Sequence, residues 1–199
     1  MIQFIEDRRG YIRLKEWKAA GHDPLNLKAL HRQGVVIKIK NGLYRLAALE
    51  DTADMPRDFI DAALALTDGI VALTSALHYH GLIQKESPTV MMAVPHNRRV
   101  PRIYHPRVQV FYFRDRFYSP GIETVDTPHG PVRLYGQEKA LCDTFRYRKK
   151  LGEKAALEAL NKYVKSNQAK GFSRLRHFAQ VCQVKQILPP YLRALVYSL

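Results

Sequence analysis

The sequence is poor in acidic residues and cysteine, and it has no long apolar run. Its 32 lysines and arginines against 18 aspartates and glutamates give a formal net charge of +14. Two isolated cysteines, Cys142 and Cys182, make no disulfide framework and fit a reducing cytosol. No stretch reaches the ~18 apolar residues that span a bilayer, and the charged residues near Met1 do not fit a secretory signal. We therefore expect a cytoplasmic protein without membrane association.

Several enzyme classes lack their sequence signatures. No Cys/His pair has metal-ligand spacing, and no Gly-rich phosphate loop is present. Ser75, His78 and Asp143 could be imagined as a triad, but Ser75 does not lie in a Gly-x-Ser-x-Gly elbow. A metal-dependent nuclease needs clustered carboxylates that hold a divalent ion. A common arrangement is one acidic residue followed by Asp/Glu-x-Lys on the next strand, and Asp126 could be the first of these. However, Glu138 and Lys139 are adjacent, so on a strand their side chains would point to opposite faces. We expect no catalytic residue, metal or cofactor, and keep the nuclease as the less favoured alternative.

The positive charge is distributed unevenly along the chain. Residues 1–50 hold 10 Lys/Arg against 5 Asp/Glu, and residues 98–150 hold 12 against 5. Residues 51–97 hold only 2 against 6. Such a balance favours a polyanionic partner, either nucleic acid or a protein with an acidic cleft, without choosing between them.

Residues 14–34 carry two short helical patterns. The first helix is expected over residues 14–20 and ends at Gly21. Asp23 then offers an N-cap oxygen, and Pro24 fits the first position of the second helix. One face of that helix should hold Leu27, Leu30 and Gly34, and the other Leu25, Lys28, Ala29 and Arg32, with Asn26 at its edge.

A basic hairpin follows the two helices. Residues 35–40 and 43–46 are typical of strands, and Asn41-Gly42 between them predicts a type I′ turn with φ > 0 at both residues. Helix, turn, capped helix and basic hairpin form the order of a winged helix-turn-helix. The plainer alternative is a small α+β unit with a solvated basic rim.

Eight residues of this region are expected to contact double-stranded DNA. The second helix would enter the major groove, where asparagine suits adenine edges and arginine or lysine suits guanine or phosphate. The hairpin would contact phosphate or the minor groove. The groove-facing residues are Asn26, Lys28 and Arg32; those of the hairpin are Lys38, Lys40, Asn41 and Arg45; and Lys15 would touch the backbone.

The rest of the chain predicts a second domain. We place the first domain at residues 1–48, an acidic linker at 49–56, and an α+β domain with a small sheet flanked by helices at 57–199. Helices are expected over 57–66, 70–80, 137–147, 151–163, 172–182 and 190–197, and strands over 89–94, 108–113, 124–125 and 132–135. Residues 95–107 should form a loop or an irregular hairpin.

The densest charge outside the first domain is the run Arg146, Arg148, Lys149 and Lys150. It is either a solvated helix end, where cations suit the helix dipole, or a surface for a partner or a second polyanion. The sequence leaves both readings open.

Three stretches together resemble the AbiEi family of antitoxins from bacterial toxin–antitoxin and abortive phage infection loci. They are the hairpin from Gly34 to Leu46, the segment from Leu73 to Leu82 with the strand ending at Pro95, and the segment from Tyr135 to Arg148 followed by Ala156–Leu160.

The resemblance implies a winged helix-turn-helix repressor that binds operator repeats in its own promoter. It also implies a C-terminal domain that counters a cognate nucleotidyltransferase toxin, directly or indirectly. A sequence-specific regulator without a toxin is the main alternative.

Overall fold

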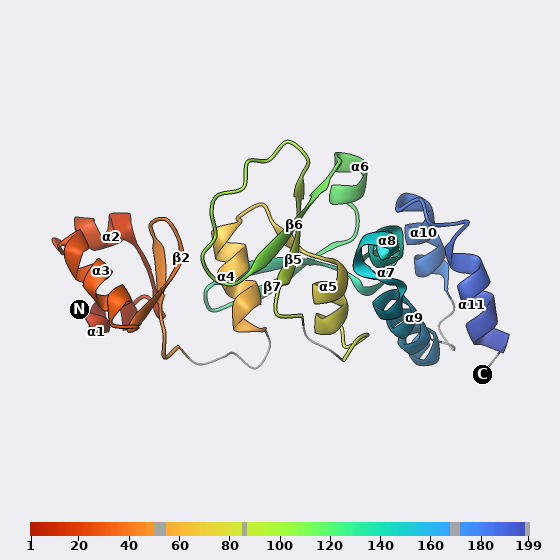
Figure 1. Cartoon of the computed structure of the whole chain (residues 1–199), viewed down its shortest axis with the longest axis horizontal. Helices are drawn as coiled ribbons and strands as arrows, with labels where there is room; N and C mark the ends of the chain where they lie inside the picture. The colour runs from red at the N-terminus through yellow and green to blue at the C-terminus, as the bar shows by residue number, and fades with distance from the viewer. Residues whose placement is uncertain (50–54, 85–86, 168–171, 198–199) are drawn as a thin grey trace.

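The computed structural model describes residues 1–49, 55–84, 87–167 and 172–197 and has a mixed α+β fold with two sheets in those ranges. Figure 1 shows an elongated arrangement, with the N-terminal helices at one end, a five-stranded sheet in the middle and C-terminal helices at the other end. Of the expected linker at 49–56, residues 50–54 lie outside the described residues.

The N-terminal elements form a small sheet with three helices. They are α1 (Ile2–Glu6), β1 (Tyr11–Arg13), α2 (Leu14–Ala19), α3 (Pro24–Arg32), β2 (Val36–Lys40) and β3 (Leu43–Leu46). Strand β3 lies between β1 and β2 and pairs antiparallel with both. The two central helices and the hairpin were predicted, whereas β1 was not, because three residues carry too little periodicity to be read as a strand.

Helix α3 begins as its sequence predicts. The Asp23 side chain accepts a hydrogen bond from the backbone N–H of Leu25 at 2.8 Å, and Pro24 occupies the first turn. Leu27 and Leu30 are buried, while Leu25 is 63% exposed. The face division read from the sequence is therefore confirmed for these residues.

The hairpin turn differs from the type I′ prediction. Of its two residues, Gly42 alone has a positive φ, at 76°. The β2–β3 register shifts between Lys38 and Lys40, which marks a β-bulge. A bulge adds local twist, so the strands can be joined without the two left-handed residues that a type I′ turn requires.

Both faces of the small sheet are covered. Ile12, Val36 and Tyr44 pack with Trp17 of α2 in a small core. Residues of the opposite face, including Tyr11 and Leu43, belong to a larger core formed mainly by the described residues from Met55 onward, the part of the chain that we call the second domain. Because side chains alternate along a strand, every second residue of β3 is directed to the second domain.

The second domain contains the five-stranded sheet and most of the helices. Its elements are α4 (Arg57–Ala65), β4 (Ile70–Val71), α5 (Leu73–Tyr79), β5 (Val90–Pro95), β6 (Val108–Phe113), α6 (Asp115–Tyr118), β7 (Ile122–Thr127), β8 (Gly130–Tyr135), α7 (Gln137–Arg146), α8 (Arg148–Leu151), α9 (Glu153–Asn167), α10 (Ser173–Val181) and α11 (Leu188–Tyr197).

The strand order is β6-β5-β4-β8-β7. Helices α6 and α8 were not predicted, and two further details depart from the sequence predictions. Residues 70–71 form a strand instead of the start of a helix. Strands β5 and β6 are parallel, so residues 96–107 are a crossover connection and cannot be a hairpin loop.

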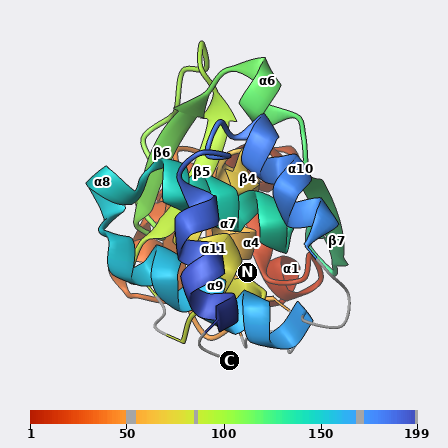
Figure 2. The same cartoon turned by 90° about the vertical axis from the view of Figure 1, so that its right-hand side faces the viewer.

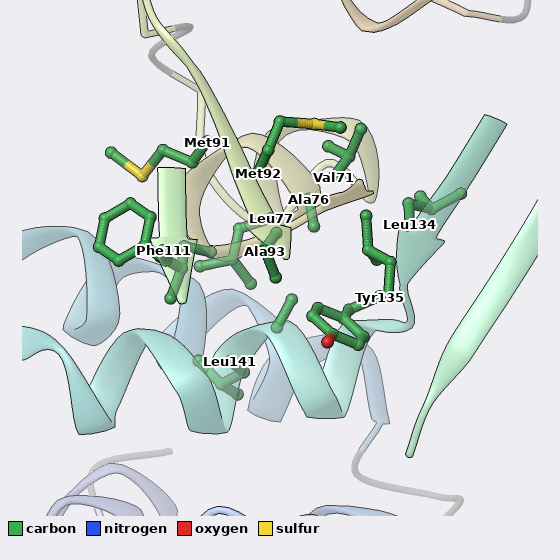
Figure 3. Close-up of a cluster of buried hydrophobic side chains, with 14 of the residues drawn as sticks. Val71, Ala76, Leu77, Met91, Met92, Ala93, Phe111, Leu134, Tyr135 and Leu141 are labelled. Carbon is green, nitrogen blue, oxygen red and sulfur yellow. The ribbon is translucent and has the colours of Figure 1, made fainter. Parts of the chain in front are cut away.

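The large core lies between the sheet and α5 and α7. Figure 3 shows Ala93 and Tyr135 of the sheet on the side of Leu141 of α7, whereas Met92, the neighbour of Ala93 on β5, points to the other face together with Val71. Helices α9 and α10 pack on α7, and α11 packs on α9 at the end of the molecule seen in Figure 2. Among the described residues, no helix combines the length and apolarity that crossing a bilayer requires.

Candidate nucleic-acid interface

Helix α3 presents polar and basic groups to solvent, with Lys28 and Arg32 on one side and Asn26 at its edge. Asn26, Lys28 and Arg32 are all exposed. Within the described part of the chain, neither Lys28 nor Arg32 forms an ion pair with a carboxylate. These three side chains are therefore available for an external partner.

Helix α2 is fixed against α3 by Trp17. Its side chain is fully buried, and its indole N–H donates to the backbone carbonyl of Asp23 at 2.9 Å. The rings of Phe4 and His22 lie against it, with centroids 5.8 and 4.4 Å away. The turn between α2 and α3 is thus held at both ends, and Lys15 remains exposed on α2.

The hairpin is joined to the crossover loop of residues 96–107. The backbone N–H of Tyr104 donates to the backbone carbonyl of Ile39 at 2.7 Å, and Ile103 forms an isolated antiparallel β-bridge with Lys40. The Lys38 ammonium lies 4.3 Å from the centroid of the Tyr104 ring, and the Tyr104 hydroxyl donates to the Asn41 side chain at 3.3 Å. Tyr104 therefore braces the two hairpin residues that were expected to contact DNA.

Sequence reasoning missed this contribution of the crossover loop. Arg102 also lies over Tyr104, with its guanidinium carbon 5.1 Å from the ring centroid. The sequence does show four arginines among prolines between two expected strands, which indicates a basic loop. No local feature, however, connects this loop to a hairpin some sixty positions earlier.

Arg45 corrects the sequence prediction. Its side chain is buried, 6% exposed, and its Nε lies 2.7 Å from Oδ2 of Asp61 in α4. The reason is strand alternation: Arg45 shares a face of β3 with Leu43, and that face packs on the second domain. Arg45 is a contact between the two parts of the chain and does not reach a surface on which DNA could lie.

Lys40 is engaged in the same interface. Its ammonium donates to the backbone carbonyl of Ala65 at 2.8 Å. Burial lowers the pKa of Lys40, and the nearby charges of Arg13 and Arg98 lower it further. Lys40 is therefore also not available for DNA, and the hairpin residues still expected to contact it are Lys38 and Asn41.

A polar cluster surrounds Asp61 at this interface. The Tyr11 hydroxyl donates to Asp61 Oδ1 at 2.6 Å, opposite the bond from Arg45. Burial raises the pKa of Asp61, and the bonds from Tyr11 and Arg45 offset part of that rise. His105 Nε2 lies 3.4 Å from Asp58 Oδ1 and 3.5 Å from Asp61 Oδ2.

The ligand atoms of Asp58, Asp61 and His105 lie within 4.8 Å of one another, a spacing that could suit a metal ion. However, the Arg45 guanidinium already supplies positive charge to Asp61, and a divalent ion there would face that cation. The arrangement fits an ion-paired contact between domains better than a metal centre.

The second basic cluster lies far from α3. Arg148 pairs with Glu153 at 3.3 Å, Lys149 is exposed, and the Lys150 ammonium lies 4.7 Å from the Phe111 ring centroid. Arg146 is half-buried, with its guanidinium carbon 3.6 Å from the Phe117 ring centroid. Figure 1 places α8 in the half of the molecule opposite α3. The two basic surfaces are therefore separate.

Two of the three imagined triad residues have structural partners, whereas Nδ1 of His78 is buried without a hydrogen-bond partner among the described residues. Ser75 accepts a hydrogen bond from the backbone N–H of Met91 at 2.9 Å. Asp143 is fully buried and paired with Lys139. Ser75 Oγ and Asp143 Oδ2 are thus used inside the core, on α5 and α7, while Oδ1 of Asp143 has no hydrogen-bond partner among the described residues. Asp126 is exposed on β7.

No protein-family profile and no curated protein matches the sequence. Among solved structures, the chain is similar to the crystal structure of the RV2827C protein from Mycobacterium tuberculosis, with a TM-score of 0.52 and 13% sequence identity. The match covers 96% of this chain and 79% of that one. At this identity the likeness concerns the fold alone, and it extends over both sheets.

Proposed function

We propose that this chain binds double-stranded DNA through an N-terminal winged helix-turn-helix, with α3 as the recognition helix and the β2–β3 hairpin as the wing. The observation that carries the proposal is the exposed Lys28 and Arg32 side of α3, which forms no ion pair among the described residues and lies opposite the buried Leu27 and Leu30 side, with exposed Asn26 at the edge. A helix with this division can lie in a major groove without exposing its own core.

The remaining elements support the same interface. The order α1-β1-α2-α3-β2-β3, with β3 in the centre of the sheet, suits a helix-turn-helix followed by a wing. Lys38 and Asn41 extend from the hairpin, and Lys15 from α2, where phosphate contacts would set the register of the protein on the duplex.

Binding to DNA upstream of the chain's own reading frame tests this proposal. Lys38→Glu in the full-length protein should weaken binding at least tenfold and reduce the salt slope by about one, because one phosphate contact is lost. Asn26→Ala should instead lower the ratio of specific to non-specific affinity, since a bidentate base contact contributes about 1–3 kcal/mol of discrimination. Unchanged affinity and specificity in both variants would refute the assignment.

The resemblance to AbiEi antitoxins extends the proposal to a biological role. We propose that the chain represses its own operon at operator repeats and neutralises a cognate nucleotidyltransferase toxin, directly or indirectly, in the bacterial cytoplasm. The cluster of Arg146, Arg148, Lys149 and Lys150 is the surface we assign to the partner or to a second polyanion, because it lies apart from α3.

Expression of the neighbouring gene tests this role. Growth should stop without this chain and recover with it, whereas Lys149→Glu with Lys150→Glu should block recovery and leave operator binding unchanged. A harmless neighbouring gene would favour a regulator without a toxin.

A metal-dependent nuclease has one supporting observation, the closely spaced Asp58, Asp61 and His105. Incubation of DNA with the protein and magnesium or manganese decides this alternative. Cleavage that disappears in Asp58→Asn would favour the nuclease over a regulator.

A further inference from the structure

A second basic site lies where α6 meets the C-terminal end of α7. A hollow of about 260 Å³ is lined there by Arg114, Arg116 and Arg146 together with Tyr112, Phe117 and Tyr147. These residues come from β6, from α6 and the residue before it, and from α7 and the residue after it. Three arginines, two from the start of α6 and one from the end of α7, thus line one small cavity.

Two of these cations share one aromatic ring. The guanidinium carbon of Arg146 lies 3.6 Å from the Phe117 ring centroid, and that of Arg116 lies 4.6 Å from it. Phe117 is 2% exposed, so the ring is a fixed support for both groups. A guanidinium stacked on a ring keeps its N–H donors directed outward from its edges, where a ligand can accept them.

The described lining of the hollow holds no counter-charge. No carboxylate lines the hollow within the described ranges, and none of its three arginines forms an ion pair there. The neighbouring carboxylate of Asp143, one turn back on α7, lies outside the lining; it is buried and paired with Lys139, and it also interacts with the charge of Arg146. Like charges held together in this way repel one another, and an anion bound between them removes that repulsion.

The hollow also has an aromatic rim. Tyr112 is 51% exposed at the end of β6. Tyr147 is half-buried, and its ring stacks on Phe113 with centroids 5.8 Å apart and an angle of 7° between the ring planes. Arginines that hold a phosphate beside an exposed ring on which a base can stack are the combination used for single nucleotides in nucleic-acid-binding grooves.

We propose that this hollow binds a nucleoside 5′-phosphate, with the phosphate held by Arg114, Arg116 and Arg146 and the base placed against Tyr112. The site is distinct from the DNA interface proposed above: α6 lies in the half of the molecule opposite α3 (Figure 1). The ligand is either a free mononucleotide or the 5′-phosphorylated end of a single strand, which present the same chemistry.

Calorimetric titration of the full-length protein tests the proposal with four probes: a nucleoside 5′-monophosphate, the nucleoside without phosphate, inorganic phosphate, and a short 5′-phosphorylated single strand. The monophosphate should bind at least tenfold more tightly than the nucleoside or inorganic phosphate alone. Tighter binding of the single strand than of the free nucleotide, or the reverse, identifies the source, and either result supports the site.

Three variants separate the parts of the site. Arg116→Gln, on an exposed side chain, should weaken monophosphate binding at least tenfold. Tyr112→Ala should weaken the monophosphate by about tenfold and leave inorganic phosphate unchanged, because only a base stacks. Arg176→Gln, an exposed arginine on α10 outside the hollow, is the charge-matched control and should change nothing. Equal melting temperatures establish that all three fold.

Four results would overturn the proposal. They are equal affinity for inorganic phosphate and the monophosphate, absence of saturable binding by every probe at millimolar concentration, an equal loss in Arg176→Gln, and displacement of the nucleotide by duplex operator DNA. The last would make the hollow a part of the duplex-binding surface.

Discussion

Replacing Asp61 with asparagine leaves the Arg45 guanidinium without its counter-charge at the contact between the small sheet and α4. The two side chains are 8% and 0% exposed, so water cannot substitute for the lost carboxylate. Removing one partner of a buried ion pair costs about 3–5 kcal/mol. For a chain of this size each kcal/mol lowers the melting temperature by roughly 2–4 °C, so Asp61→Asn should melt roughly 6–20 °C below the wild type.

The single tryptophan makes the assay specific. Trp17 is the chain's one tryptophan and is buried in the N-terminal core, so its fluorescence follows that part, while circular dichroism follows the whole chain. In Asp61→Asn the fluorescence transition should move to a lower denaturant concentration. Asp58→Asn is the matched control on the same helix; its side chain is 45% exposed, so it should cost less than about 1 kcal/mol. Equal losses in the two variants would refute the interface as described.

Further predictions concern the pH dependence of stability and the packing of the large core. Burial, aided by the charges of Arg57 and Arg9, lowers the pKa of His129 below its ordinary 6.5. Protons then bind the unfolded state more readily, so the free energy of unfolding should fall as the pH drops below about 6.5; His129→Asn should flatten that part of a pH series, and an unchanged series would contradict the shift. Lys139→Met leaves the buried Asp143 without its counter-charge and should lower the free energy of unfolding, measured by urea denaturation, by about 3–5 kcal/mol. Lys139→Met combined with Asp143→Leu should recover most of this loss. Equal losses in the single and the double variant would argue against the ion pair. Gly121→Ala should cost roughly 1–3 kcal/mol by thermal melting, because its φ is +77° and the added Cβ would lie 2.8 Å from Lys139 Cβ; a neutral result would contradict this packing.

Local signals predicted the elements around α3. Asp23 and Pro24 give a cap and a first turn that depend only on neighbouring residues, and the structure contains both. The alternation of apolar and polar residues along α3 likewise predicted which side is buried. These features follow from backbone chemistry within a few positions, so the sequence contains all that they require.

Long-range partners could not be predicted in the same way. The run of basic residues from Lys28 to Arg45, with no acidic residue between them, places Arg45 on the expected DNA surface. Its partner Asp61 lies in another domain, and Tyr104 reaches the hairpin from a loop of the five-stranded sheet. One signal was available: Leu43 shares the strand face of Arg45, and an apolar residue there suggests that the face is covered.

The hollow lined by Arg114, Arg116 and Arg146 likewise depends on contacts between distant parts of the chain that the sequence does not reveal. Arg114 and Arg116 are about thirty positions from Arg146, and only the packing of α6 on the end of α7 brings them together. The charge run was visible in the sequence, but its division into an ion-paired Arg148, exposed lysines and a pocket arginine was not.

One titration tests most directly whether α3 reads DNA. Full-length protein is titrated onto the DNA upstream of its reading frame at several salt concentrations, with Lys28→Glu plus Arg32→Glu compared against Lys162→Glu plus Lys165→Glu. Both pairs reverse two exposed charges on a helix. The α3 pair should lose affinity by orders of magnitude with a salt slope shallower by about two, because each phosphate contact contributes about 0.9, while the α9 pair should stay near the wild type. Equal binding by the two variants would contradict the assignment of α3.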